Sequence, residues 1–188
     1  MMRLPVSPAF EKNNLAITLQ TSDYFAPYAS VTILSIIENA SPKYNYDLLV
    51  MTWDMQEKTE EKLISMADGK NNISIRVVDV SREIDPYVKM AVGKSNFERF
   101  GATGLIRLVL LDLLEHYDVV LNFDCDMLIC GDVSELFQYD ISNYYMGAAP
   151  DLICYAAFHR QKEIKYTQFT DDLIYNQLKL DDVSEYLN

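Results

Sequence analysis

The sequence has few cysteines and no long apolar run. Its 188 residues contain 3 cysteines, at positions 125, 130 and 154, and no two of them form a Cys-x-x-Cys pair. An odd number without regular spacing indicates a reducing compartment rather than a disulfide framework. No apolar stretch approaches the length of a membrane-spanning helix, and residues 1–12 lack the apolar centre of a signal peptide. These absences predict a cytoplasmic protein without a transmembrane segment.

Positive charge is also scarce. The chain has 16 Lys and Arg residues against 28 Asp and Glu, which gives a net charge of −12. This balance argues against nucleic acid or an anionic membrane surface as the main partner. It does not exclude a nucleotide, because a metal ion can bridge phosphates to carboxylates. The hydrophobic share of 49% is ordinary for a soluble protein, and the length suffices for one domain with a substantial core.

Strand-like and helix-like patterns alternate along the first part of the chain. Short β-type runs at residues 15–19, 46–53 and 73–80 are separated by helical patterns at 27–39, expected to be largely buried, and 56–66, which Asp54 can cap. This alternation predicts an α/β fold with a mostly parallel sheet flanked by helices. Residues 1–12 are expected to form a loose arm, and residues 13–188 a single domain.

Further along, the patterns are less regular. Residues 81–100 contain Pro86 and Gly93 and predict an irregular connection. Residues 101–114 predict an apolar helix that carries one buried-looking charge, Arg107. A short run follows at residues 144–149, before Pro150 and Asp151.

The most informative stretch covers residues 118–137. An apolar run, interrupted only by Asn122, predicts a buried strand, and Asp124 and Asp126 follow it at once. Residues i and i+2 of an extended backbone point to one side. Both carboxylates can therefore face one point past the strand's carboxyl end, where open α/β sheets bind ligands. Two such oxygen ligands suit Mn²⁺ or Mg²⁺, which usually also hold phosphates. Asp132 or Ser134 could cap a short helix over residues 133–137.

The extended string is more specific than Asp-x-Asp alone. An apolar strand, Asp-x-Asp, three apolar residues, Gly131-Asp132 and then Leu136-Phe137 resembles glycosyltransferase family 8, retaining enzymes that use nucleotide sugars and have the GT-A fold. Residues 20–28, Gln-Thr-Ser-Asp-Tyr-Phe-Ala-Pro-Tyr, resemble the family's uridine-binding loop and the helix start after it. Ser22 replaces that loop's first acidic residue and Tyr24 its Asn, which leaves the base open, whereas Asp23 is retained.

The resemblance implies roles for individual residues. Asp124 and Asp126 would hold the metal, with Cys125 between them either at the site or packed behind it. Arg107 would contact donor phosphate or sugar, with a structural ion pair to Asp124 or Asp126 as the alternative. Tyr24 or Phe25 could stack on the base or pack in the core. The donor-site residues are Thr21, Ser22, Asp23, Tyr24, Arg107, Asp124, Cys125, Asp126, Asp151, which could instead cap a helix, and Asn188.

The implied activity is transfer of a hexose from a UDP-sugar to a glycan or lipid-linked acceptor, with retention, in the cytoplasm or at the inner face of a membrane. The resemblance runs from Leu15 to Asn188, and the family's later motifs, including its third metal ligand, have no match. The chain is therefore expected to be the donor-binding part of an enzyme that is truncated at its C-terminus. This part is expected to have no activity on its own. Apolar surface left uncovered would promote homo-oligomers.

Two rival functions fit the same motif. One is a sugar-nucleotide-binding fragment without catalytic activity. The other is a phosphatase of the haloacid dehalogenase type, whose Asp-x-Asp follows the first strand of its domain. Here three strands precede the motif, and Leu128 occupies the place usually held by Thr or Val. No catalytic nucleophile can be identified.

Overall fold

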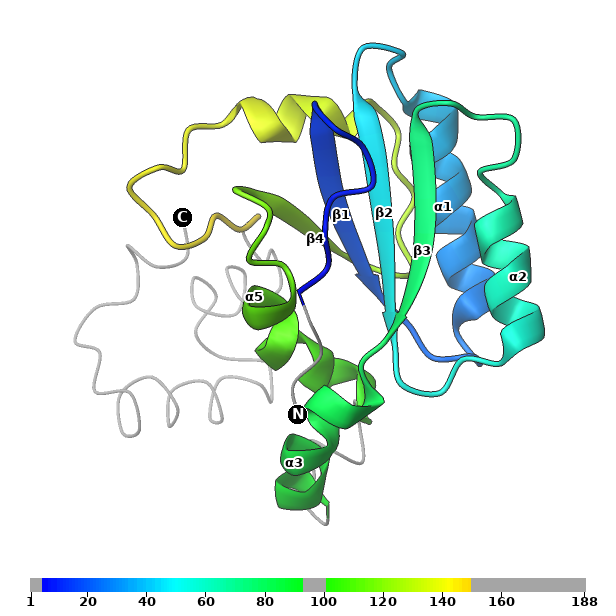
Figure 1. The fold of residues 1–188 in the computed structure, drawn as a ribbon, viewed down its shortest axis with the longest axis vertical. Coiled ribbons are helices and arrows are strands. Elements are labelled where there is room, and N and C mark those ends of the chain that lie inside the picture. The colour runs from blue at the N-terminus through cyan, green and yellow to red at the C-terminus, as the bar shows by residue number, and fades with distance from the viewer. Residues whose placement is uncertain (1–4, 93–100, 150–188) are drawn as a thin grey trace, which may run out of the picture. The chain divides into compact units, whose positions relative to one another are not determined.

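Four parallel strands form one sheet, which is flanked by helices (Figure 1). The structure is a computed structural model that describes residues 5–92 and 101–149. The strands are β1 (Asn14–Gln20), β2 (Asn45–Thr52), β3 (Ile73–Asp79) and β4 (Val120–Asp124), in the order β3-β2-β1-β4. The predicted α/β class and its parallel sheet are confirmed. The chain divides into two units, residues 1–139 and 140–188, and the sheet belongs to the first.

Helices α1 (Ala26–Asn39) and α2 (Glu57–Ser65) cover one face of the sheet (Figure 1). The core cluster on this side includes Ile17 of β1, Leu48 of β2 and Ile33 of α1. Pro27 lies in the first turn of α1, where its missing N–H is not needed. The expectation that α1 is largely buried is wrong for Val31 and Leu34, which are 53% and 50% exposed. They line a groove of about 400 Å³ between α1 and α2.

The opposite face is covered by helical segments that follow β3. These are α3 (Ser81–Ala91), the 3₁₀ helix η1 (Thr103–Val109) and α5 (Leu110–Leu113). Leu49, Met51 and Val78 of the strands pack against Ile84 of α3 and Ile106 of η1. β1 and β2 are therefore buried on both faces, as is usual for parallel strands. The prediction of a buried strand is wrong for β4, whose residues are half-buried or exposed because it lies at the edge of the sheet.

Two expectations about this side need correction. Residues 81–91 form a helix rather than an irregular connection, although Pro86 lies inside it. A proline removes one N–H donor, and burial of the Ile84 side chain supplies packing that the local pattern does not reveal. The predicted helix at 101–114 is mostly a 3₁₀ helix, with only four α-helical residues at its end.

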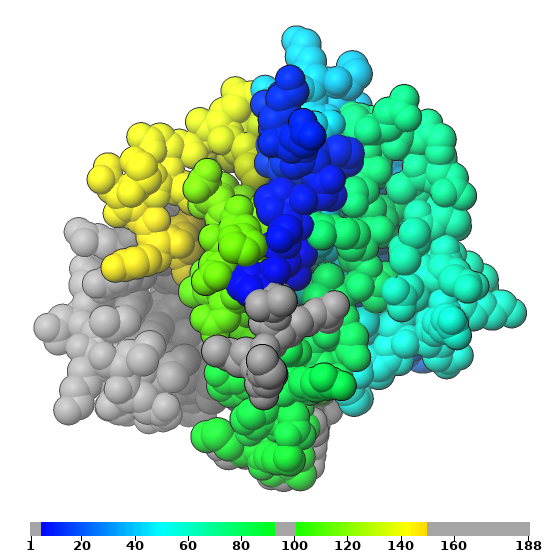
Figure 2. All heavy atoms as spheres, viewed as in Figure 1, coloured from blue at the N-terminus to red at the C-terminus, as the bar shows by residue number. Residues whose placement is uncertain are grey.

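The N-terminal segment is anchored in residues 5–12, contrary to the expected loose arm. It lies at the surface, in blue in Figure 2. The Val6 N–H donates to the Leu113 carbonyl at 2.8 Å, and the Ala9 N–H donates to Asp47 Oδ2 at 2.9 Å. Arg76 Nη1 donates to the Ser7 carbonyl at 2.9 Å. Side-chain acceptors and donors from the sheet hold this segment, and its own sequence gives no sign of them.

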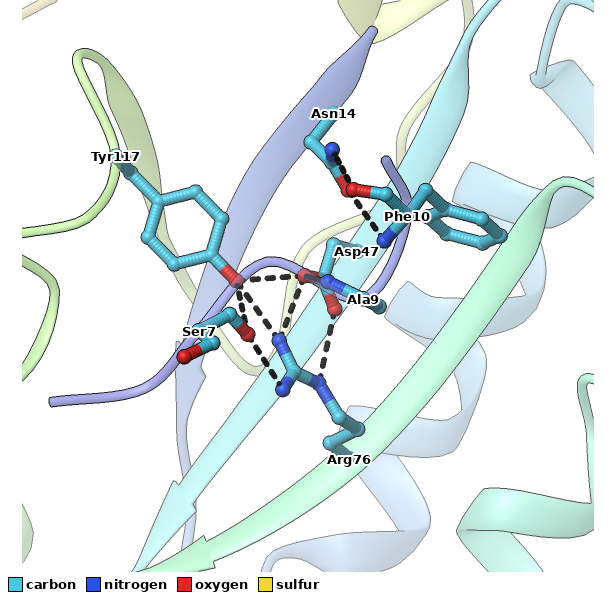
Figure 3. Close-up of polar contacts among 7 residues, drawn as sticks. All are labelled: Ser7, Ala9, Phe10, Asn14, Asp47, Arg76 and Tyr117. Carbon is cyan, nitrogen blue, oxygen red and sulfur yellow. Dashed lines mark hydrogen bonds and ion pairs between the residues drawn. The ribbon is translucent and has the colours of Figure 1, made fainter. Parts of the chain in front are cut away.

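A polar cluster of three side chains makes this anchor (Figure 3). Asp47 of β2 is fully buried and accepts bonds from Arg76 Nε at 3.1 Å and Nη2 at 2.6 Å. The Tyr117 hydroxyl donates to the same carboxylate at 2.6 Å. Burial, followed by this hydrogen bond to Asp47, raises the pKa of Tyr117 well above its ordinary value. Tyr117 therefore stays a donor at neutral pH, and the buried carboxylate has the partners it needs.

The 3₁₀ helix η2 (Val133–Gln138) ends the described part of the first unit. Asp132 caps it, as predicted, by accepting from the Ser134 N–H at 2.9 Å. Within residues 140–149 of the second unit, a turn is closed by the Tyr144 N–H, which donates to the Ile141 carbonyl at 2.9 Å. The run at 144–149 is not a strand. Within the described residues, no helix is long and apolar enough to cross a membrane.

Candidate functional site

The candidate site lies where β1 and β4 end side by side. Gln20 and Asp124, the last residues of these strands, are register partners. The loop after β1 and the acidic segment after β4 therefore leave the sheet next to each other. β1 pairs with β2 on its other side, so the direction in which the strand order runs along the sheet reverses at this point. Ligands of open α/β sheets bind at such a switch point, beyond the carboxyl ends of the strands.

Asp124 ends β4, and Asp126 lies in the turn that follows. Both residues are exposed, whereas Cys125 between them is half-buried. The alternation between half-buried and exposed residues along β4 thus continues into the turn. It leaves both carboxylates accessible, as the sequence predicts. Within residues 5–92 and 101–149, no three or more His, Cys, Asp or Glu side chains form a group that could hold a metal ion. A metal ion at Asp124 and Asp126 would therefore need further ligands from elsewhere.

Cys125 faces Thr21, the first residue after β1. Burial raises the pKa of the Cys125 thiol, and the charges of Asp126 and Asp124 act in the same direction. A hydrogen bond with the Thr21 side chain opposes this rise but is smaller than the effect of burial. The thiol is therefore protonated at neutral pH. The half-burial of Cys125 agrees with a packing role, and its contact with a donor stays a prediction.

The backbone of the acidic segment is anchored to α1 by side chains that the sequence interpretation missed. The Thr32 hydroxyl lies 2.8 Å from the Cys125 carbonyl and 2.7 Å from that of Met127, and it accepts from the Met127 N–H at 3.0 Å. Ser35 Oγ accepts from the Ile129 N–H at 3.0 Å. The only sequence signal was the presence of Thr and Ser, three residues apart, on the inner face of an apolar helix.

Arg107 of η1 joins the acidic segment to β1. Its Nη2 donates to Asp124 Oδ1 in an ion pair. Its Nε lies 3.5 Å from Gln20 Oε1. Of the two roles expected for Arg107, the ion pair with Asp124 is present, and contact with a donor stays a prediction.

Asp23 has a structural role that the sequence did not reveal. Its carboxylate accepts from the Gln56 N–H and from Gln56 Nε2, both at 3.0 Å, and so caps the start of α2. Asp54, the predicted cap, instead accepts from the Asp23 N–H at 3.1 Å. The bond from the Gln56 backbone, followed by one from the Thr59 hydroxyl, lowers the pKa of Asp23. Asp23 is therefore ionised at neutral pH, and its proposed contact with a nucleotide stays a prediction.

Aromatic side chains border the loop after β1. Tyr24 is 78% exposed, and its ring meets the edge of Phe25 at a centroid distance of 5.2 Å. Packing of Tyr24 in the core is thereby excluded, and its ring is free to meet a ligand. The Ser22 hydroxyl accepts weakly from the Phe25 N–H at 3.4 Å. The predicted site residues Asp151 and Asn188 lie outside the described residues.

Comparisons with known proteins agree with this arrangement. The family model of Glycosyl transferase family 8 matches residues 16–176. The chain belongs to this family. A candidate glycosyltransferase of Haemophilus influenzae is 30% identical over 135 residues, which are 72% of this chain and 38% of that protein. Membership in Glycosyl transferase family 8 excludes the phosphatase alternative.

Solved structures of two glycosyltransferases share the fold. Apo WbbM, a bifunctional enzyme, matches with a TM-score of 0.78 and 21% identity, over 98% of this chain and 31% of WbbM. The galactosyltransferase LgtC, solved with donor and acceptor sugar analogs, matches with a TM-score of 0.61 and 22% identity, over 82% of this chain and 51% of LgtC. These matches confirm the predicted GT-A, Rossmann-like class. The chain spans about half or less of each relative.

Proposed function

We propose that this chain binds a UDP-sugar for a metal-dependent glycosyl transfer that retains the anomeric configuration. The observation that carries the proposal is the position of Asp124 and Asp126 at the β1–β4 switch point, with Arg107 paired to Asp124. The two carboxylates supply ligands for a cation, and Arg107 supplies a positive charge at the same edge of the sheet. A diphosphate needs both, because its charge is neutralised by metal and Arg together.

The donor set fits Mn²⁺ or Mg²⁺. Asp124 and Asp126 offer hard carboxylate oxygens, and both are exposed to a ligand that would complete the coordination. Mg²⁺ in particular is usually held by one or two carboxylates together with substrate phosphates. When bound, the metal would neutralise the charge that develops on the leaving UDP. Asp124 and Asp126 would hold it, and the half-buried Cys125 would keep the turn between them packed.

Arg107 would bind the diphosphate directly. A guanidinium has five N–H donors, and the bonds to Asp124 and Gln20 engage only two of them. The others can reach phosphate oxygens at the same edge of the sheet. A charge fixed before the reaction stabilises the leaving group without reorganisation.

The loop after β1 would hold the nucleoside. The exposed ring of Tyr24, supported at its edge by Phe25, offers a face on which a base can stack. Ser22 lies beside it and supplies a hydroxyl group. Thr21 is fully buried, and its hydroxyl donates to the Ser22 carbonyl at 3.1 Å, so its role is to shape the loop rather than to contact the donor. We assign uracil as the base, a hexose as the sugar, and a glycan or lipid-linked acceptor in the cytoplasm.

Calorimetric titration of UDP, with Mn²⁺ and again with EDTA, tests this proposal. The parent should bind UDP only with metal, and Asp124→Asn and Asp126→Asn should each abolish this binding while the melting temperature stays within a few degrees. Asp85→Asn, which removes an exposed carboxylate from α3, is the matched control and should bind as the parent does. Binding that survives EDTA, or that persists in either site variant, would contradict the proposal.

A second candidate is donor binding without transfer. The described residues contain no group of three or more His, Cys, Asp or Glu side chains that could hold a metal ion, so they do not by themselves complete a metal site. Release of UDP from UDP-hexoses in the presence of Mn²⁺ distinguishes the two candidates, because a binding module releases none.

A further inference from the structure

Gln20 and Asn122 are polar residues at positions where the neighbouring strand residues are apolar. Gln20, the last residue of β1, is buried, and Thr18 two residues before it is fully buried. Asn122 interrupts the apolar run of β4 and pairs with Thr18 in register. Buried polar groups destabilise a fold unless they are hydrogen-bonded. Thr18 and Gln20 therefore need partners, and Asn122, whose side chain lies at the exposed edge of the sheet, supplies an acceptor to both.

Asn122 fixes which way the Gln20 amide points. Asn122 Oδ1 accepts from the Thr18 hydroxyl at 2.9 Å and also from Gln20 Nε2. The Gln20 Oε1 atom is thereby turned toward Arg107 Nε, at 3.5 Å. The reverse orientation would set an NH₂ group against the guanidinium N–H, and two donors cannot bond. The network thus presents an acceptor to Arg107 rather than a donor.

Arg107 consequently has two acceptors of different kinds. One is the charged carboxylate of Asp124, and the other is the neutral oxygen of Gln20. A divalent cation on Asp124 would compete for that carboxylate and would repel the guanidinium. The metal does not compete for the bond to Gln20, because this bond joins Nε of Arg107 to a side chain of β1 and not to Asp124.

We propose that Gln20 and Asn122 are positioning residues that keep Arg107 at the site when a metal ion occupies Asp124. Gln20 holds the Nε edge of the guanidinium, so that its Nη groups remain directed to the diphosphate. Asn122 acts one step further back by orienting Gln20. This inference rests on the proposed function for its use in donor binding, whereas the positioning of Arg107 can be measured without any donor.

The test uses Gln20→Met and Asn122→Leu, which keep the approximate side-chain shape and remove the acceptor. With saturating Mn²⁺, each should bind UDP roughly tenfold more weakly than the parent, the expected effect of losing one hydrogen bond to a charged group. In an Arg107→Met background, Gln20→Met should have no further effect, because it acts through Arg107. Equal affinities for Gln20→Met and the parent, or an equal loss in the Arg107→Met background, would overturn the proposal.

A second readout does not depend on UDP. The Arg107 Nε–H resonance, assigned by its loss in Arg107→Lys, should stay protected from solvent exchange in the parent when Mg²⁺ is added. It should lose this protection in Gln20→Met and keep it in Asn122→Asp, which retains the accepting oxygen. If the parent binds no UDP, the proposed function fails, and this resonance alone decides the positioning role. Unchanged protection in Gln20→Met would overturn it.

Discussion

The anchor of the N-terminal segment makes a sharp prediction for Asp47→Asn. Asparagine keeps the shape of the side chain but removes the charge that Arg76 and Tyr117 share. Breaking a buried ion pair usually costs about 3–5 kcal/mol. We expect the lower end, about 3 kcal/mol, because the Arg76 side chain is 31% exposed and water can solvate it. For a chain of this size, that loss lowers Tm by about 6–12 °C.

Thermal unfolding followed by circular dichroism measures this effect, and α3 offers the matched control. Lys89 and Asp85 also form an ion pair, at 2.5 Å, but both side chains are largely exposed. Lys89→Gln should therefore lower the stability by less than about 0.5 kcal/mol. A change in Tm for Asp47→Asn as small as that for Lys89→Gln would refute the reasoning, since it would mean that the cluster in Figure 3 contributes no more than a surface pair.

Two further predictions concern titrating groups. In a variant with Cys130 and Cys154 changed to Ser, Cys125 should react with iodoacetamide more slowly than a free cysteine at pH 8, because burial raises the pKa of its thiol; a rate equal to that of glutathione would contradict this. Burial, with the hydrogen bond to Asp132, raises the pKa of Tyr46 to about 12. The stability that Tyr46 adds is therefore complete below its ordinary pKa of about 10 and is lost as the pH rises toward 12. Urea unfolding should show the advantage of the parent over Tyr46→Phe shrinking in that range, and a constant difference up to pH 12 would count against it.

The fold could be predicted because its signals are local. Each strand is a short apolar run, and α1 and α2 follow the helical period. α3 was missed because Pro86 looks like an interruption, whereas the burial of Ile84 is decided by residues elsewhere in the chain. The cap of α2 was assigned to the neighbouring Asp54, but Asp23, 33 residues before Gln56, supplies it.

The site was predictable only in part for the same reason. Asp124 and Asp126 directly follow their strand, so the motif is visible in a single stretch of sequence. The side chains that support them come from far away. Thr18 bonds to Asn122 across 104 residues, and Thr32 bonds to the Cys125 carbonyl across 93. No local pattern identifies such partners, because they are determined by which strands pair and by how α1 lies on the sheet.

The attachment of the acidic segment to α1 has a consequence for how this site can diversify. Thr32 and Ser35 bond to peptide groups of residues 125–129 and not to their side chains. Any residue that accepts the same backbone shape can therefore occupy positions 127 and 128. Met127 and Leu128 are exposed beside the carboxylates. Substitutions at these two positions can change which molecules contact the edge of the site, while the turn that carries Asp126 keeps its position.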